Sequence, residues 1–223
     1  MSGFNYANLV TDIRNYTEVG DSVLTAAIIN RFIEDAEFKI FYDVPIDAYR
    51  YVSEGTFVAD DNTINAPGKG TQGATGAVFI RGIEVFNSTS TTAGQGIWLE
   101  KKDQTYLSEY VGRLTGTEGD LTNQDTTALP KYYAMFGGAT GTTTTTSGGM
   151  YVAPTPDQNY KFRIYYTMMP KSLVTETSGT YISQYFPSGL LYACLVEAYG
   201  FLKGPMDMLT LYEQKYKQEV QKF

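Results

Sequence analysis

Helical periodicity marks the beginning of the chain. Apolar side chains recur there at intervals of three or four residues, which predicts two amphipathic helices separated by Gly20. Asn5 is expected to cap the first helix, and Asp21 or Ser22 the second. Pro45 should end the second helix because proline lacks the backbone N–H that the helix needs. The apolar stripes consist of Leu9, Val10, Ile13 and Tyr16 in the first helix and Leu24, Ile28, Ile29, Phe32, Ile33, Ala36 and Ile40 in the second.

The end of the chain is helical by the same criterion. From Pro187 onward, apolar side chains cover nearly every face, which predicts a helix buried at the centre of the fold. Gly204-Pro205 interrupts it, and a last amphipathic helix is expected from about Met206 to Lys222. Its apolar stripe consists of Leu209, Tyr212, Tyr216 and Val220.

The middle of the chain changes to the pattern of strands and turns. Short runs of β-branched and aromatic residues are separated there by Gly, Asn and Asp. A short helix is expected at 103–111, and polar loops, three of them rich in Thr or Gly, at 66–76, 87–96, 115–128 and 139–149. The predicted strands are 48–52, 56–58, 77–86, 97–100, 131–136, 150–153 and 160–169.

Helices at both ends and strands between them predict an α+β fold. We expect a discontinuous helical bundle built from residues 1–43 and 184–223. Residues 44–183 would then form a β-rich insertion with flexible loops. The two ends of the chain should lie close together, as they often do in compact domains.

Composition narrows the range of functions. The 223 residues include no histidine and a single cysteine, which excludes Ser-His-Asp and Cys-His catalytic sets, zinc sites built from such clusters and intramolecular disulfides. The formal net charge of −7 argues against binding nucleic acid through counterion release. No apolar run approaches the length of about 18 residues that a membrane helix needs, and the first residues do not resemble a signal peptide. A soluble, non-secreted protein is expected.

Few side chains are placed for chemistry. Glu34 and Glu37 share a helix face, but neighbouring basic side chains favour a solvated surface over an acid–base pair. The glycine-rich segment 66–76 lacks the pattern of a phosphate-binding loop. Cys194 lies among apolar residues, which favours a buried thiol over a nucleophile. We therefore predict that the protein is not an enzyme and has no catalytic, metal or cofactor site.

Tyrosine is abundant, and 12 of its 19 residues lie in the C-terminal half. Tyrosine rings fill cores and are also enriched at protein interfaces, and the sequence leaves both uses open. Stacking on nucleic-acid bases is disfavoured because no basic groove is evident.

Six sequence blocks follow one another in an order typical of one protein family. They are Y6-x-x-LV-x-x-I13-x-x-Y16-TE, F32-IEDAE37, L129-PKYYA-x-F136, M150-YVAPTPD157, Y160-KFRIYYTMMPKSL173 and P187-SGLLYACLVEAYGFLKGP205. Together they resemble the head–tail adaptor (connector) proteins of tailed bacteriophages. The resemblance extends over nearly the whole chain and rests on the order of the blocks, since no block is a catalytic motif.

The resemblance implies a structural protein of the phage neck, assembled in the host cytoplasm into a virion. Such adaptors form a ring of about a dozen copies that docks on the portal protein, extends the DNA channel and provides the platform for downstream tail or nozzle proteins. The partners would be the portal, neighbouring copies and those tail proteins, with genomic DNA passing through the lumen without sequence-specific binding and no membrane involved. The portal-binding residues implied for this chain are Tyr212, Lys215, Tyr216, Lys217, Lys222 and Phe223.

Two other functions remain open from the residues alone. A tail hub, baseplate or tail-completion protein would share the polar loops and aromatic surface. A carbohydrate-binding or carbohydrate-processing β module that depends on carboxylates would explain the combination of aromatic and acidic residues.

Overall fold

A computed structural model describes residues 3–67, 76–88, 94–110, 127–136 and 149–223. The chain divides into two compact units. We call Met1–Ala48 together with Pro170–Phe223 the helical unit, and Tyr49–Met169 the β unit. The second boundary lies earlier in the chain than the expected position at 183, because the segment before the C-terminal helices packs with the helices.

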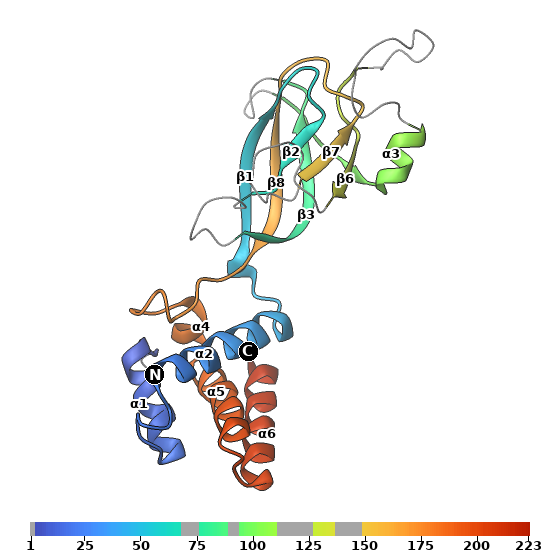
Figure 1. Ribbon diagram of the computed structural model, residues 1–223. Helices are drawn as coiled ribbons and strands as arrows, with labels where there is room; N and C mark the ends of the chain where they lie inside the picture. The colour runs from blue at the N-terminus through green and yellow to red at the C-terminus, as the bar shows by residue number, and fades with distance from the viewer. Residues whose placement is uncertain (1–2, 68–75, 89–93, 111–126, 137–148) are drawn as a thin grey trace. The chain divides into compact units, whose positions relative to one another are not determined.

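The helical unit is organised around one central helix. Helix α5 (Pro187–Phe201) contacts all the other described helices of this unit (Figure 1). These helices are α1 (Tyr6–Thr17), α2 (Ala26–Asp43), α4 (Tyr181–Tyr185) and α6 (Met206–Lys222). The position of α5 follows from its sequence, since eight of its residues are buried and its apolar side chains are not confined to one face.

The observed helix caps agree with the predicted ones in part. Asn5 caps α1, and its side chain accepts a hydrogen bond from the N–H of Asn8. The predicted cap of α2 at Asp21 or Ser22 is wrong: Thr25 occupies the N-cap position. Helix α4 was not predicted from its five residues, although Thr180 and Ser183 form a capping box before it.

Glu37 is the clearest departure from the sequence prediction in the helical unit. It was expected on a solvated surface, yet only 4% of it is exposed. Its carboxylate accepts bonds from the backbone N–H of Leu173 at 3.0 and 3.2 Å and from the hydroxyl of Thr180 at 3.5 Å. Burial raises the pKa of this carboxyl, although these hydrogen bonds oppose the shift. Through these hydrogen bonds, Glu37 links α2 to the segment that leads into α4.

The β unit contains two four-stranded sheets. The first has the order β1-β8-β3-β4, and its pairs are all antiparallel. The second has the order β2-β7-β6-β5, in which β5 and β6 run parallel. The strands are β1 (Arg50–Phe57), β2 (Thr63–Asn65), β3 (Ala77–Phe86), β4 (Gly96–Trp98), β5 (Glu100–Lys101), β6 (Tyr132–Phe136), β7 (Gly149–Ala153) and β8 (Tyr160–Met168).

Both sheets contribute to one hydrophobic core. Phe162 and Ile164 of β8 are buried in it together with Met150 and Val152 of β7, so the sheets pack face to face. Helix α3 (Gln104–Tyr110) covers the other side of the second sheet, where Leu107 is fully buried. A short 3-10 helix, Asp47–Tyr49, precedes β1.

Most strand predictions are confirmed. The predicted strand 77–86 matches β3, and the alternation predicted along 160–169 appears in β8, where Tyr160, Phe162 and Ile164 are buried. The runs 48–52 and 56–58 belong to one strand, β1, and β2 was not predicted. The loops predicted at 66–76, 87–96, 115–128 and 139–149 lie mostly outside the described residues. The α+β class is as predicted.

Replacing Gly55 with Val is expected to destabilise the β unit by about 2 kcal/mol, because overpacking a tight contact costs about 1–3 kcal/mol. Gly55 pairs with Phe162 across β1 and β8, and a Cβ atom on it would collide with the Phe162 ring. Guanidinium unfolding followed by the fluorescence of Trp98, the only tryptophan, measures the loss. The exposed neighbour Thr56→Val is the control, and equal stability of both variants would contradict this account.

Candidate interaction surface

The C-terminal helix α6 is held in place by a cluster of tyrosine rings. Tyr212 is 5% exposed, and the centroid of its ring lies 6.5 Å from that of Tyr16, 6.2 Å from Tyr192 and 5.2 Å from Tyr199. The Tyr199 hydroxyl donates to the carbonyl of Tyr16 at 2.9 Å. Burial raises the pKa of Tyr212 to about 12, so the hydroxyl stays neutral. Tyr212 therefore joins α6 to α5 and α1.

Tyr216 joins α6 to α2. Its hydroxyl donates to Oδ2 of Asp43 at 2.7 Å, and only 3% of the residue is exposed. The ammonium of Lys39 lies 4.9 Å from the centroid of the ring. Burial, followed by the bond to Asp43, raises the pKa of the Tyr216 hydroxyl.

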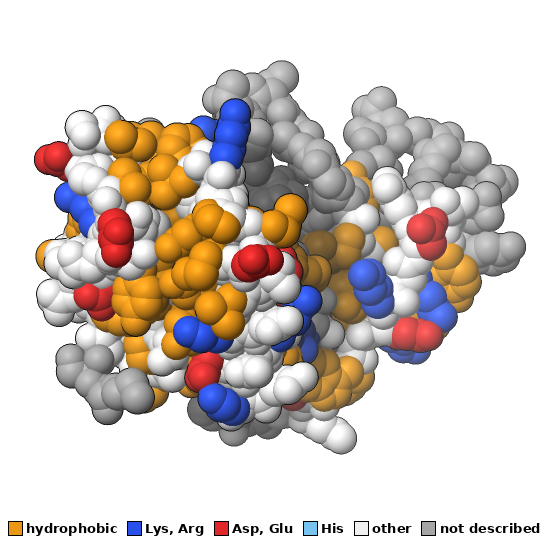
Figure 2. Space-filling model, turned by 90° about the horizontal axis from the view of Figure 1, so that it is seen from below, with side chains coloured by type: hydrophobic (Ala, Val, Ile, Leu, Met, Phe, Trp, Pro, Cys, Tyr) orange, Lys and Arg blue, Asp and Glu red, His pale blue; other side chains and the backbone are white. Residues whose placement is uncertain are grey.

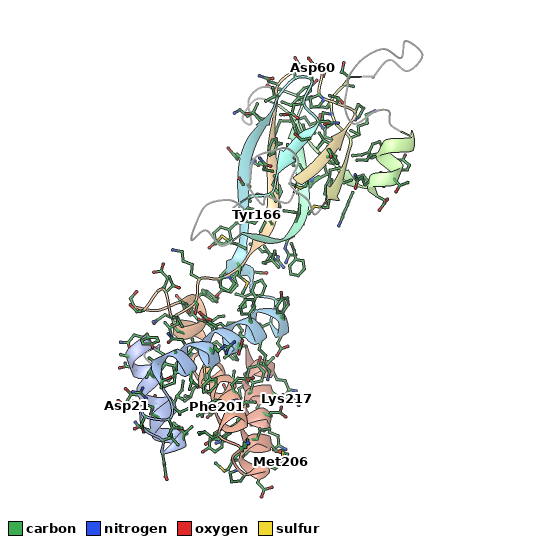
Figure 3. All side chains as sticks on the ribbon, viewed as in Figure 1. Asp21, Asp60, Tyr166, Phe201, Met206 and Lys217 are labelled. Carbon is green, nitrogen blue, oxygen red and sulfur yellow. The ribbon has the colours of Figure 1, made fainter. Side chains whose placement is uncertain are left out.

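The lysines of α6 lie at its surface or over its aromatic cluster. Lys215 places its ammonium 5.4 Å and 5.6 Å from the ring centroids of Tyr192 and Tyr212. Lys222 forms an exposed ion pair with Glu219 at 2.7 Å. Lys217 is exposed on α6 (Figure 3) and borders a hollow of about 260 Å³ whose floor includes Tyr216 and Val220.

A second hollow lies at the last residue. Its volume is about 450 Å³, and it is lined by Phe223, Lys222 and Glu219 from the end of the chain and by 184–188 from α4 and α5. The Phe223 ring lies 4.8 Å from that of Phe186, and 47% of Phe223 is exposed. Tyr185 beside it is 67% exposed. An aromatic rim around a concave surface suits the insertion of a partner's side chain.

Further apolar side chains are exposed at the opposite end of α6. Phe201 and Met206 flank the turn between α5 and α6 and are 50% and 74% exposed (Figure 3). Seen from below, hydrophobic side chains cover much of this part of the helical unit (Figure 2). Patches of this kind mark interaction sites in soluble proteins.

The six residues predicted to bind a partner fall into two groups. Lys217, Lys222 and Phe223 are exposed. Tyr212 and Tyr216 are buried, with Lys215 half-buried above the rings, so these residues position α6. The hollow formed with residues 184–188 was missed from the sequence, since it joins segments that are far apart along the chain.

The described residues offer little for catalysis. They contain no cluster of three acidic or cysteine side chains that could hold a metal ion. Cys194 is fully buried, and burial raises the pKa of its thiol, as predicted for a structural cysteine. None of the described helices is long and apolar enough to cross a membrane. The exposed features of the helical unit are those of a binding surface.

Comparison with known proteins agrees with this geometry. The family model described as SU10 adaptor protein matches residues 4–223 and so covers both units. Among curated proteins, none matches the sequence. Phage adaptors are structural components of the virion. The chain therefore belongs to the SU10 adaptor family of phage head–tail adaptor proteins, as its sequence blocks indicate.

Proposed function

We propose that this protein forms a ring of about a dozen copies in the phage neck, docks on the portal, extends the DNA channel and carries the proteins of the tail. The observation that carries the proposal is the family match over residues 4–223, which includes both the helical and the β unit. Each copy would contact its neighbours through two different faces, as a closed ring of identical subunits requires.

The helical unit is the part that docks on the portal. Support comes from its exposed apolar side chains and from the hollow at Phe223, which together offer shape and hydrophobic contact to a partner. Lys217, Lys222 and Phe223 contact the portal directly, while Tyr212 and Tyr216 keep α6 in the required position.

The acidic composition suits a channel through which DNA slides. A net charge of −7 on each copy gives a ring with a strongly negative field. Like charges repel the phosphate backbone, so the genome does not bind to the wall.

A mass measurement tests the proposal. The purified protein is mixed with purified portal rings, and the mass of the product is determined by native mass spectrometry or analytical ultracentrifugation. A complex with about one adaptor for each portal subunit is expected. A portal that stays free at adaptor concentrations of about 100 µM would contradict the proposal and favour another position in the tail.

Removing Phe223 or reversing the charge with Lys217→Glu is expected to weaken portal binding about tenfold each, the effect of losing one well-packed contact. Lys217 is exposed on α6, and Phe223 follows the helix with 47% of its surface exposed, so both changes leave the buried contacts of Tyr212 and Tyr216 in place. Titration of labelled portal with each variant gives the dissociation constants. Asp60→Asn, an exposed change in the β unit, is the control and should bind like the natural protein (Figure 3). If the Phe223 and Lys217 variants bind as tightly as this control, the assignment is wrong.

A further inference from the structure

The outer face of the first sheet of the β unit carries an ordered aromatic surface. Trp98 of β4 is 58% exposed, and the centroid of its ring lies 4.9 Å from that of Tyr165 on β8. Strand register places both residues on the side of the sheet opposite to Ile164 and Phe162, which are buried in the core. We call Trp98 and Tyr165 the aromatic shelf.

A glycine beneath the shelf lets the indole approach the sheet closely. Gly82 of β3 pairs with Tyr165, and a Cβ atom on Gly82 would lie 2.9 Å from Cζ3 of Trp98. The absence of a side chain therefore leaves room for the indole next to the β3 backbone, while 58% of Trp98 stays exposed. A ring supported in this way loses little conformational entropy when a ligand stacks on it.

Polar side chains form a row beside the shelf. Glu54, Arg163 and Glu84 face one another across β1, β8 and β3, and Glu84 is also directly opposite Trp98 on β4. Nε of Arg163 donates to Oε1 of Glu54 at 2.8 Å, and the Tyr165 hydroxyl donates to Oε2 of Glu84 at 2.9 Å. The row thus has fixed acceptors and donors next to an exposed ring face.

We propose that the aromatic shelf and the row Glu54–Arg163–Glu84 bind a neutral oligosaccharide. A pyranose ring has an apolar face of C–H groups, which stacks on an indole, and a rim of hydroxyls. The hydroxyls would donate to the two carboxylates and accept from the guanidinium. This binding site goes beyond the proposed place in the neck and does not depend on it.

The size of the exposed ring and the charges beside it suit a neutral sugar. An indole that is 58% exposed offers on the order of 100 Å² of ring surface, since whole aromatic side chains bury about 150–250 Å². That area matches one or two sugar rings. Because Arg163 stands between two carboxylates and pairs with one of them, a strongly charged ligand gains little here.

The only tryptophan of the chain reports on this site directly. The purified full-length protein is titrated with maltohexaose, cellohexaose and the hexamer of N-acetylglucosamine, each up to about 10 mM, which detects dissociation constants near 1 mM. A saturable change in Trp98 emission, together with protection from quenching by acrylamide, is expected for at least one of them. No change with any of the three overturns the proposal.

Variants then locate the bound sugar. Trp98→Ala, measured by calorimetry, is expected to raise the dissociation constant at least tenfold. Glu84→Gln keeps Trp98 as the fluorophore, and it should raise the dissociation constant about fivefold because a charged hydrogen-bond acceptor is lost. Tyr42→Ala, at a residue 64% exposed in the helical unit, is the matched control and should leave it unchanged. Unchanged sugar affinity in Trp98→Ala overturns the proposal. So does a change in Trp98 emission with protein concentration in the absence of sugar, because it would show that the ring contacts another copy of the chain.

Discussion

Replacing Glu37 with Ala is expected to lower the free energy of unfolding of the helical unit by about 3 kcal/mol. The side chain is 4% exposed and accepts two contacts from the N–H of Leu173 and one from Thr180. Without the carboxylate, the Leu173 N–H stays buried and loses the acceptor seen in the structure, and a cavity of several methylene groups remains. The connecting segment 170–180 then loses its attachment to α2.

The variant Glu37→Gln distinguishes the contribution of hydrogen bonding to stability from that of the ionisable carboxyl group. A carboxyl pKa that is raised by burial means that the folded protein binds the proton more tightly than the unfolded chain does. The contribution of Glu37 is therefore greatest below its unfolded pKa of about 4.3 and is lost as the pH rises through the raised folded value. Compared with Glu37→Gln, which does not titrate, the natural protein should gain stability as the pH falls from above the raised folded pKa of Glu37 toward its unfolded pKa of about 4.3.

Urea unfolding at several pH values, followed by circular dichroism at the helix band, measures both effects. Glu34→Ala is the control, because Glu34 is exposed on the same helix and surface substitutions change stability by less than about 0.5 kcal/mol. If Glu37→Ala and Glu34→Ala were equally stable, the role given to Glu37 would be incorrect.

The sequence predicts elements whose signal is local. The stripe Leu9–Ile13 gives α1, the side chain of Asn5 gives its cap, and the apolar run in α5 gives a buried helix. The burial of Glu37 depends on Leu173, which is 136 positions away in the chain. No pattern within one helix contains that information, so its charge alone suggested a solvated position.

The surface of α6 shows the same contrast between what a local pattern predicts and what depends on distant residues. The apolar stripe of α6 already placed Tyr212 and Tyr216 on the side that packs, and both are buried. The exposure of Phe223 and the hollow beside Phe186 depend on packing between α6 and the start of α5, which the sequence does not specify. The exposed position of Trp98 likewise depends on Gly82 of another strand, and no local pattern around Trp98 specifies it.

The thiol of Cys194 allows the stability of the helical unit to be measured in a second way, by the rate of its chemical labelling. It is the single cysteine of the chain, it lies in α5, and none of it is exposed. Its Sγ lies 3.9 Å from the carbonyl oxygen of Phe32, the acceptor of a weak hydrogen bond. Burial, and then the charges of Glu37 and Glu197, raise the pKa of the thiol far above its ordinary range. Both the lack of access and the lack of thiolate suppress its reaction.

In the native protein, labelling of Cys194 by a disulfide reagent such as DTNB is expected to be at least about 10³-fold slower than in the unfolded chain. The reagent reaches the thiol only when the helical unit opens, and an opening free energy of about 5 kcal/mol corresponds to a population of roughly 1 in 5,000. Glu37→Ala should accelerate labelling about 150-fold, which is the same loss of about 3 kcal/mol expressed as a rate at 1.36 kcal/mol per factor of ten. Glu34→Ala serves again as the control. If the native protein were labelled at the rate of the unfolded chain, α5 would not be the buried centre of the helical unit.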